Sequence, residues 1–189
     1  MVRSNGTLIL WTGQRHSGKT TMAARLAQIA RREGFEVGGL LAPSVYRDGI
    51  LVGFDCFDLR GGTRTPLLRR GRDTSKPSTF TFVAEGLKLG KAALSLFATR
   101  SADLVIVDEF GPFELNYQGW RKNVDALLAS SDAVILLVVR QQLAEQVQSA
   151  LSGGYANPAS CVLAAAHPQS INKVITTLRD RTTLRRVAK

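Results

Sequence analysis

The residues from Gly13 to Thr20 have types and spacing that suit the binding of a phosphate chain. The segment reads Gly13-Gln14-Arg15-His16-Ser17-Gly18-Lys19-Thr20 and fits G-x-x-x-x-G-K-S/T at every fixed position. Glycines let backbone N–H groups approach the phosphates, and the N-terminus of a following helix adds the positive end of its dipole. Lys19 then reaches the β- and γ-phosphates, and the Thr20 hydroxyl binds Mg²⁺. We therefore expect residues Gly13 to Thr21 to hold a nucleotide.

Two adjacent acids, Asp108 and Glu109, follow the apolar run "LVIV". Asp108 should stand at the carboxyl end of a buried strand, where α/β sheets place their ligands. We expect Asp108 to hold a water ligand of Mg²⁺, and Glu109 to polarise a water molecule for in-line attack on the γ-phosphate. Two acids that only cap a strand end are the alternative. The pair favours hydrolysis over binding alone.

Two further residues, Arg140 and Glu114, are candidates for the site, and two histidines are weighed beside them. Arg140 ends the run "AVILLVV", and in a parallel sheet it would reach the same edge as Asp108, where it could neutralise the γ-phosphate. A surface arginine is an equal alternative. Glu114 is either functional or one acid in a Gly-Pro loop. We expect His16 and His167 to be structural, because neither has a metal-binding partner nearby.

The elements that position these residues alternate along the chain. Apolar and β-branched runs predict strands, and the 3.6-residue spacing of apolar side chains predicts helices. The predicted strands are Thr7–Thr12, 36–43, 45–59 as a hairpin turning at "RDG", 78–84, 102–110, 131–139 and 159–166. The predicted helices start near Gly18, at Glu85 with Leu87, Ala93, Leu94 and Phe97 on one face, and at 169, with Ile171, Val174, Ile175 and Leu178 buried. Residues 60–76 are expected to form a loop.

This order predicts an α/β fold. Near-continuous apolar runs separated by helices suit strands that are covered on both faces. We expect a three-layer α/β/α domain with a mostly parallel sheet, and an antiparallel edge formed by the hairpin within 45–59. At 189 residues and 44% hydrophobic content, one domain spanning 1–189 is expected.

Composition excludes several protein classes. The longest apolar run, Ala133 to Val139, is far shorter than the roughly 18–20 residues that cross a bilayer. The N-terminal apolar stretch is too short for a signal peptide, so we predict a cytoplasmic protein without a membrane partner. Cys56 and Cys161 lack the spacing of a zinc site and are expected to be reduced core thiols.

The net charge of +10 is concentrated in two segments. Residues 60–76 and 173–189 each carry six basic residues and one acid, so each has a net charge of +5 and the rest of the chain is neutral. Such segments could attract a nucleic-acid backbone, although a solvated loop and tail are the commoner explanation.

The segment "DEFGPFEL", Asp108 to Leu115, resembles the D-E-x-G-x-x-E-L signature of the small THEP-type nucleoside triphosphatases. "GFEVGGLLAP" and "GILVGFDCFDL", with the pair Gly53-Phe54, are similar to other segments of that family. The resemblance extends from about Thr7 to Arg140. It implies a monomeric P-loop domain that slowly hydrolyses ATP, GTP and other nucleoside triphosphates with Mg²⁺. By position it makes Glu109 the catalytic carboxylate and Lys19, Thr20 and Asp108 the phosphate and metal residues.

The chain departs from this family at two places. Leu51 stands where family members usually have a basic residue, and "KPSTFTFVAEGLKLG" does not reproduce their R-V-G-K-Y-like segment. Base preference and turnover are therefore open, and the arginine-rich "LRRGRDTSK" is one candidate substitute.

Two other functions remain open at this point. A small nucleotide or metabolite kinase could use "RRGRDTSK" to clamp a phosphorylated acceptor, although no lid domain is evident. A nucleic-acid-binding ATPase or adaptor could use the two basic segments.

Overall fold

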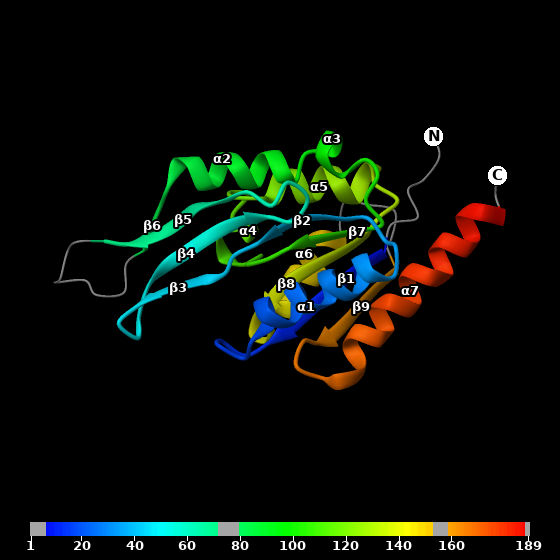
Figure 1. Cartoon of the computed structure of the whole chain (residues 1–189), viewed down its shortest axis with the longest axis horizontal. Helices are drawn as coiled ribbons and strands as arrows, with labels where there is room; N and C mark the ends of the chain where they lie inside the picture. Colours follow the sequence, from blue (N-terminus) through cyan, green and yellow to red (C-terminus); the bar gives the residue numbers. More distant parts are fainter. Residues whose placement is uncertain (1–6, 72–79, 153–158, 188–189) are drawn as a thin grey trace.

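The computed structural model describes residues 7–71, 80–152 and 159–187. Strands and helices alternate along the chain as the apolar pattern predicts (Figure 1). In chain order the elements are β1 (Thr7–Gly13), α1 (Lys19–Arg32), β2 (Val37–Leu41), β3 (Ser44–Arg47), β4 (Ile50–Asp58), β5 (Arg64–Arg70), β6 (Phe80–Phe82), α2 (Ala84–Ala93), α3 (Leu96–Thr99), β7 (Leu104–Val107), α4 (Pro112–Leu115), α5 (Arg121–Ser130), β8 (Val134–Arg140), a 3-10 turn (Gln141–Leu143), α6 (Ala144–Ser152), β9 (Ala159–Ala164) and α7 (Pro168–Val187).

Within these ranges the strands form one nine-stranded sheet. Its order is β6-β5-β4-β2-β7-β8-β1-β9, with β3 paired to β4 outside this path. The five strands β2, β7, β8, β1 and β9 run parallel, whereas β3 to β6 pair antiparallel and extend the left side of the molecule in Figure 1. Because β8 lies between β1 and β7, the carboxyl ends of these three strands meet at one edge.

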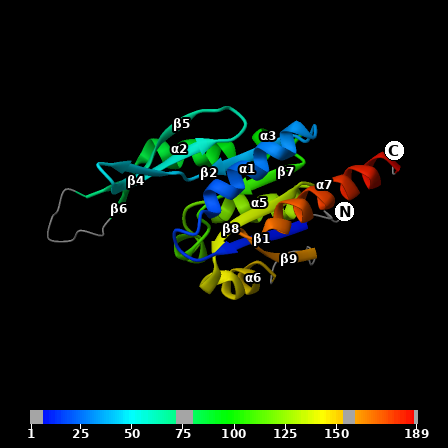
Figure 2. The same ribbon diagram turned by 60° about the horizontal axis from the view of Figure 1, so that its bottom comes forward.

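Two apolar layers cover the two faces of the sheet. Leu8 and Leu10 point into a core with α2, α5 and α6, while Ile9 and Trp11 point into a core with α1 and α7. In Figure 2, α6 and α7 lie on opposite sides of β1 and β9. This alternation along a strand buried on both faces confirms the predicted three-layer α/β/α fold, with its mostly parallel sheet and antiparallel edge.

The prediction of a loop over 60–76 is wrong for part of that range. Arg64–Arg70 forms β5, pairing with β4 on one side and β6 on the other. Leu67 is buried in the core on the α2 side of the sheet and Leu68 packs against the same core, so two apolar residues and pairing on both sides hold a strand whose arginines suggest a loop in the sequence. Residues 60–63 and 71 lie outside helices and strands, as predicted, and residues 72–76 lie outside the described residues.

The predicted helix beginning at Glu85 is interrupted. α2 ends at Ala93, and Ser95 starts α3 by accepting a hydrogen bond from the backbone N–H of Ala98 at 3.2 Å. Serine favours this capping geometry over a continuous helix. As a result Leu94 is buried, as predicted, but Phe97 is 74% exposed and packs under the Arg100 guanidinium.

Three smaller predictions have clear outcomes. The stripe on α7 with Ile171 and Val174 is buried, as predicted. Cys56 is a buried free thiol, and burial raises its pKa to about 12, while the side chain of Cys161 lies outside the described part. Among the described helices, none combines the length and the apolar character needed to cross a bilayer.

Candidate active site

The loop between β1 and α1 has the backbone conformation that its glycines allow. Gly18 (φ 79°) and His16 (φ 60°) adopt left-handed conformations just before the helix begins at Lys19. A Cβ at Gly13 would lie 2.6 Å from Ser17 Oγ, so the loop folds tightly on itself. Left-handed backbone is easy for glycine and costly for other residues, which explains why the pattern fixes glycine at position 18.

Lys19 lies inside this loop. Its side chain is buried, and its Nζ donates a hydrogen bond to the Gln14 carbonyl at 2.7 Å. The ammonium group is therefore held over the loop backbone, where its charge faces the space that a phosphate chain needs.

Asp108 stands directly after β7 and is fully buried. Its carboxylate accepts hydrogen bonds from the backbone N–H of Ala42 and of Glu109, both at 3.0 Å, and it also bonds the side chain of Thr20. Burial raises the pKa of Asp108 to about 6, and the charge of Glu109 adds to this rise. The fold thus brings together Thr20 of α1 and Asp108 at the end of β7, the two residues predicted to bind metal.

Glu109 and Arg140 lie beside each other at the same edge. Arg140 ends β8 and stands opposite Gly13 in the parallel register, so it lies between the loop and Asp108. Its Nη2 is 3.8 Å from Glu109 Oε2, and both side chains are about two-fifths exposed. Glu109 itself has φ 58°, a conformation that is strained for a residue with a side chain. All three predicted catalytic residues therefore border one space.

Glu114 makes contacts that stabilise the chain turn following Asp108 and Glu109. It is buried, and its two carboxylate oxygens accept hydrogen bonds from the backbone N–H of Gly111 at 2.9 Å and of Trp120 at 3.4 Å. Burial raises the pKa of Glu114 to about 7 against these hydrogen bonds. These contacts give Glu114 a loop-holding role.

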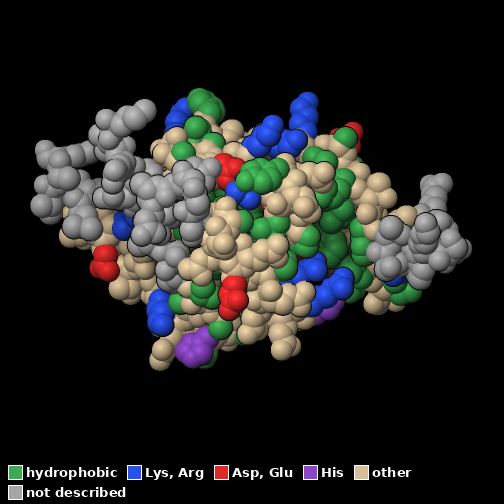
Figure 3. Space-filling view, turned by 180° about the vertical axis from the view of Figure 1, so that it is seen from behind, with side chains coloured by type: hydrophobic (Ala, Val, Ile, Leu, Met, Phe, Trp, Pro, Cys, Tyr) green, Lys and Arg blue, Asp and Glu red, His purple; other side chains and the backbone are tan. Residues whose placement is uncertain are grey.

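A groove of about 730 Å³ runs from the phosphate loop past these residues. One end is polar, with Lys19, Thr20, Glu109 and Arg140, and the other end is apolar. Sequence reasoning missed this apolar end, which is lined by Tyr46, Phe54, Leu67, Leu68, Phe80, Phe82, Phe113 and Trp120. Figure 3 shows hydrophobic side chains gathered in a hollow beside Lys and Arg side chains, the combination that these lining residues give.

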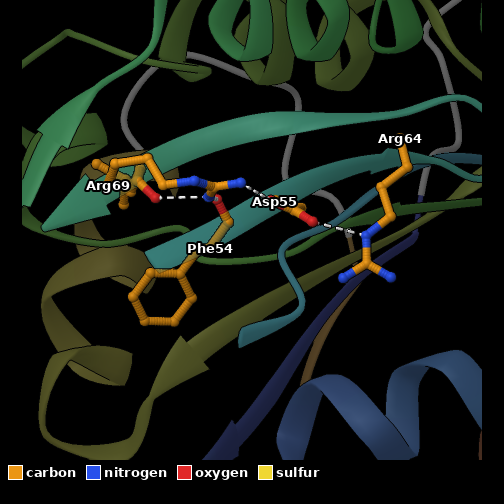
Figure 4. Close-up of polar contacts among 5 residues, drawn as sticks. Phe54, Asp55, Arg64 and Arg69 are labelled. Carbon is orange, nitrogen blue, oxygen red and sulfur yellow. Dashed lines mark hydrogen bonds and ion pairs between the residues drawn. The ribbon is translucent and has the colours of Figure 1, made fainter. Parts of the chain in front are cut away.

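The arginines at the antiparallel edge bind protein groups. Arg64 Nε and Arg69 Nη2 contact the two oxygens of Asp55 at 2.7 and 2.5 Å (Figure 4). Arg69 also donates to the Phe54 and Leu68 carbonyls. Burial raises the pKa of Asp55, but the hydrogen bonds from both arginines outweigh it and hold the pKa below its usual value. Arg69 is therefore engaged with protein groups, and a nucleotide-binding role for "LRRGRDTSK" stays a prediction, because residues 72–76 lie outside the described part of the chain.

The Gly53-Phe54 pair has a structural reason. A Cβ on Gly53 would lie 2.2 Å from the Leu68 carbonyl oxygen, so glycine lets β5 approach β4 closely. Phe54 then points into the groove.

Of the two histidines, His16 is exposed in the loop and His167 accepts a hydrogen bond from the backbone N–H of Gln169. No cluster of three metal-binding side chains occurs in the described ranges.

Comparisons with known proteins agree with this geometry. The model of a family described as NTPase matches residues 8–157. Nucleoside-triphosphatase THEP1 of Methanothermobacter thermautotrophicus is 34% identical over 145 residues, covering 74% of this chain and 80% of that protein. Its counterpart in Methanopyrus kandleri is 31% identical over 125 residues, covering 66% and 67%.

Two solved structures share the fold. The crystal structure of THEP1 from the hyperthermophile Aquifex aeolicus superposes with a TM-score of 0.66 at 17% identity, covering 92% of this chain and 98% of that one. The solution structure of a human cancer-related nucleoside triphosphatase gives 0.62 at 21% identity, covering 97% and 98%.

Proposed function

The chain belongs to the NTPase family and is a nucleoside-triphosphatase, and we propose that it hydrolyses ATP, GTP and other nucleoside triphosphates with Mg²⁺ and little base selectivity. The observation that carries this proposal is the meeting of four groups at one sheet edge. Lys19 and Thr20 come from the start of α1, Asp108 from the end of β7, and Arg140 from the end of β8. Glu109 completes the set.

Thr20 and Asp108 fit a magnesium ion. Mg²⁺ prefers oxygen ligands and keeps several waters, so one hydroxyl and one carboxylate beside the phosphates suffice. Within the described ranges, the buried Asp108 carboxylate has Thr20 as its side-chain hydrogen-bond partner and accepts two backbone N–H groups besides. When bound, the ion would neutralise charge on the β- and γ-phosphates.

Glu109 is the proposed general base. A water molecule attacks the γ-phosphorus in line, its proton passes to the Glu109 carboxylate, and the bond from the γ-phosphorus to the β–γ bridging oxygen breaks. The products are the nucleoside diphosphate and phosphate. Lys19 and Arg140 stabilise the negative charge on the phosphoryl oxygens as this happens.

Arg140 also holds Glu109 before the nucleotide arrives. The separation of 3.8 Å between Arg140 Nη2 and Glu109 Oε2 is a loose ion pair at a half-exposed position. A γ-phosphate offers the guanidinium a stronger, bidentate partner than this carboxylate. We therefore infer that nucleotide binding draws Arg140 toward the phosphate and leaves Glu109 to bind water.

The direct test is phosphate release from ATP, GTP, CTP and UTP with Mg²⁺. Glu109→Gln should lower kcat by about 10²–10⁴-fold with little change in nucleotide binding, because it removes only the proton acceptor. Lys19→Ala should weaken both nucleotide binding and turnover. Chelation of Mg²⁺ by EDTA should abolish phosphate release.

Glu145→Gln is the matched control, because Glu145 is an exposed glutamate on α6. It should leave phosphate release unchanged. Wild-type turnover in Glu109→Gln would reject Glu109 as the base, and strong preference for one of the four triphosphates would reject the broad base selectivity.

A further inference from the structure

The groove has an apolar part whose side chains come mostly from the antiparallel side of the sheet, beyond β7 as counted from β1 in the strand order. We call it the aromatic compartment and define it by Phe54, Phe80, Phe82, Phe113 and Trp120, all of which line the groove. These side chains come from β4, β6, α4 and the start of α5. Water and the phosphate chain are polar, so the nucleobase is the one part of a nucleoside triphosphate that could stack on such a wall.

Ring contacts hold the wall in place. Phe82 stacks on Phe113 with ring centroids 4.6 Å apart and an interplanar angle of 26°. Phe54 meets Phe80 edge to face at 5.7 Å and 66°. Trp120 is 3% exposed, and a Cβ on Gly90 would lie 2.4 Å from its ring, so Trp120 is fixed against α2. A wall built in this way is preformed for a flat ring.

The order of the catalytic groups shows which end of a nucleotide faces this wall. Lys19 reaches the β- and γ-phosphates, and Glu109 must face the γ-phosphate to activate water. The chain continues from Glu109 into Pro112 and Phe113, which line the groove next. The aromatic compartment therefore begins where the triphosphate ends, whereas the nucleoside leaves from the opposite, α-phosphate end.

The cations that line the groove, Arg15, Lys19 and Arg140, come from the phosphate loop, the start of α1 and the end of β8, not from the elements of the wall, which disfavours a phosphorylated occupant at the wall. Arg64 and Arg69 are bound to Asp55, and Arg69 also bonds two carbonyls. The oxygens of Glu114 already accept two backbone N–H groups. The five wall side chains themselves are uncharged, so stacking and apolar contact are the interactions they offer.

We propose that the aromatic compartment binds a second ligand, an uncharged molecule with a flat aromatic ring, at the same time as the nucleotide and next to its γ-phosphate. The proposal rests on the proposed function, because the γ-phosphate is placed by Lys19 and Glu109. The ring stacks on the Phe82 and Phe113 pair, and its edge faces Glu109.

Binding of small probes to nucleotide-loaded protein tests this proposal. The protein is saturated with Mg²⁺ and AMP-PNP, a triphosphate analogue that is not hydrolysed, and titrated with adenosine, thymidine, indole and benzyl alcohol. Saturation-transfer NMR measures each Kd. At least one probe should bind the loaded protein. Phe82→Ala and Phe113→Ala should each weaken it about tenfold, because each removes one ring of the stacked pair.

Phe97→Ala is the control, because Phe97 is an exposed aromatic residue outside the groove. It should leave probe binding unchanged. The KM for ATP in Phe82→Ala should stay within about twofold of the wild-type value. The proposal is overturned if Phe82→Ala raises the KM for ATP as much as it raises the probe Kd, and if the probe and AMP-PNP exclude each other. That result would identify the compartment as the site of the substrate's own base.

Absence of binding by all four probes to the loaded protein would also overturn it. Phosphate release by the wild type without any probe is measured beforehand. If the wild type releases no phosphate, the proposed function is rejected. The probe titration measures binding without hydrolysis, so the two failures are distinguishable.

Discussion

At the scale of single residues, the backbone of Glu109 stores strain at the point where catalysis is proposed. Its φ of 58° lies in the left-handed region, which costs about 1–2 kcal/mol for a residue with a Cβ. The buried Asp108 beside it accepts the Glu109 N–H and fixes this turn. The conformation directs the Glu109 side chain toward Arg140 and away from the core. Stability and catalysis therefore oppose each other here.

Glycine and alanine at position 109 should separate the two effects. Both remove the carboxylate, so both should lose phosphate release. Glu109→Gly relieves the strain, whereas Glu109→Ala keeps it, so the glycine variant should be more stable than the alanine variant by about 1 kcal/mol. Urea denaturation of both variants measures this difference. Equal stability, or a more stable alanine variant, would show that the left-handed backbone is not maintained in solution.

Glu114 should make stability depend on pH. Its pKa is raised from 4.5 to about 7 in the folded protein, so the folded state holds this proton more tightly than the unfolded chain. The stabilisation from protonated Glu114 is thus complete below about pH 4.5 and is lost as pH rises through about 7. The loss is of the order of 3 kcal/mol.

Glu114→Gln provides the comparison for this prediction. The free energy of unfolding of the wild type minus that of Glu114→Gln should fall between pH 4.5 and pH 7 and then level off. Taking the difference removes the contributions of other titrating groups, including Asp108. A difference that stays constant over this range would show that Glu114 titrates normally and does not hold the loop in the buried form described.

The site residues that could be predicted from the sequence are those that match a pattern of fixed spacing along the chain. The loop from Gly13 to Thr20 and the pair Asp108-Glu109 meet fixed local patterns, and the parallel sheet then brings Arg140 to them. The aromatic compartment could not be predicted in this way. Phe54, Phe82 and Phe113 meet only after β4, β6 and α4 assemble, and no local spacing records that meeting.

At the scale of elements, the packing of α2 depends on two glycines, although glycine is unfavourable inside a helix. Gly86 and Gly90 weaken the helical pattern, because glycine in a helix costs about 1 kcal/mol relative to alanine. Both are buried. A Cβ at Gly86 would lie 2.2 Å from the Pro66 carbonyl oxygen, and one at Gly90 would strike Trp120. Close packing on β5 and Trp120 outweighs propensity, and it also explains why β5 was missed.

Gly86→Ala tests this packing because the two effects have opposite signs. Helix propensity alone predicts stabilisation by about 1 kcal/mol, whereas the backbone clash with Pro66 predicts destabilisation by about 1–3 kcal/mol. We expect destabilisation, measured by thermal or urea unfolding. Lys88→Ala is the control, since Lys88 is exposed on the same helix and should change stability little. A more stable Gly86→Ala protein would place α2 farther from β5 than described.

At the scale of the whole molecule, five arginines of the two basic segments are bound to other groups of the protein. In the segment 60–76, Arg60 donates to the Ala98 carbonyl, and Arg64 and Arg69 bind Asp55. In the segment 173–189, Arg179 binds Glu33 at 2.7 Å, and Arg181 bonds Thr7 and the Asp132 carbonyl.

These contacts fix arginines to neighbouring elements, including α1, β1 and β4. The net charge of +10 is unchanged by these contacts, but they restrain the arginines, so fewer of these side chains are free to adapt to a nucleic-acid backbone. The basic segments therefore contribute to the fold as well as to the surface charge.

Binding of single-stranded RNA should consequently be weak and dependent on salt. Each phosphate contacted contributes about 0.7 to the slope of log K against log[salt], so contacts to about four phosphates or fewer should give a slope below about 3. Filter binding should detect RNA at about 50 mM salt and lose it by about 200 mM, with no stimulation of phosphate release. Sub-micromolar binding that persists at 200 mM salt, or hydrolysis that RNA stimulates, would contradict this and identify nucleic acid as a partner, because counterion release alone cannot give salt-resistant affinity.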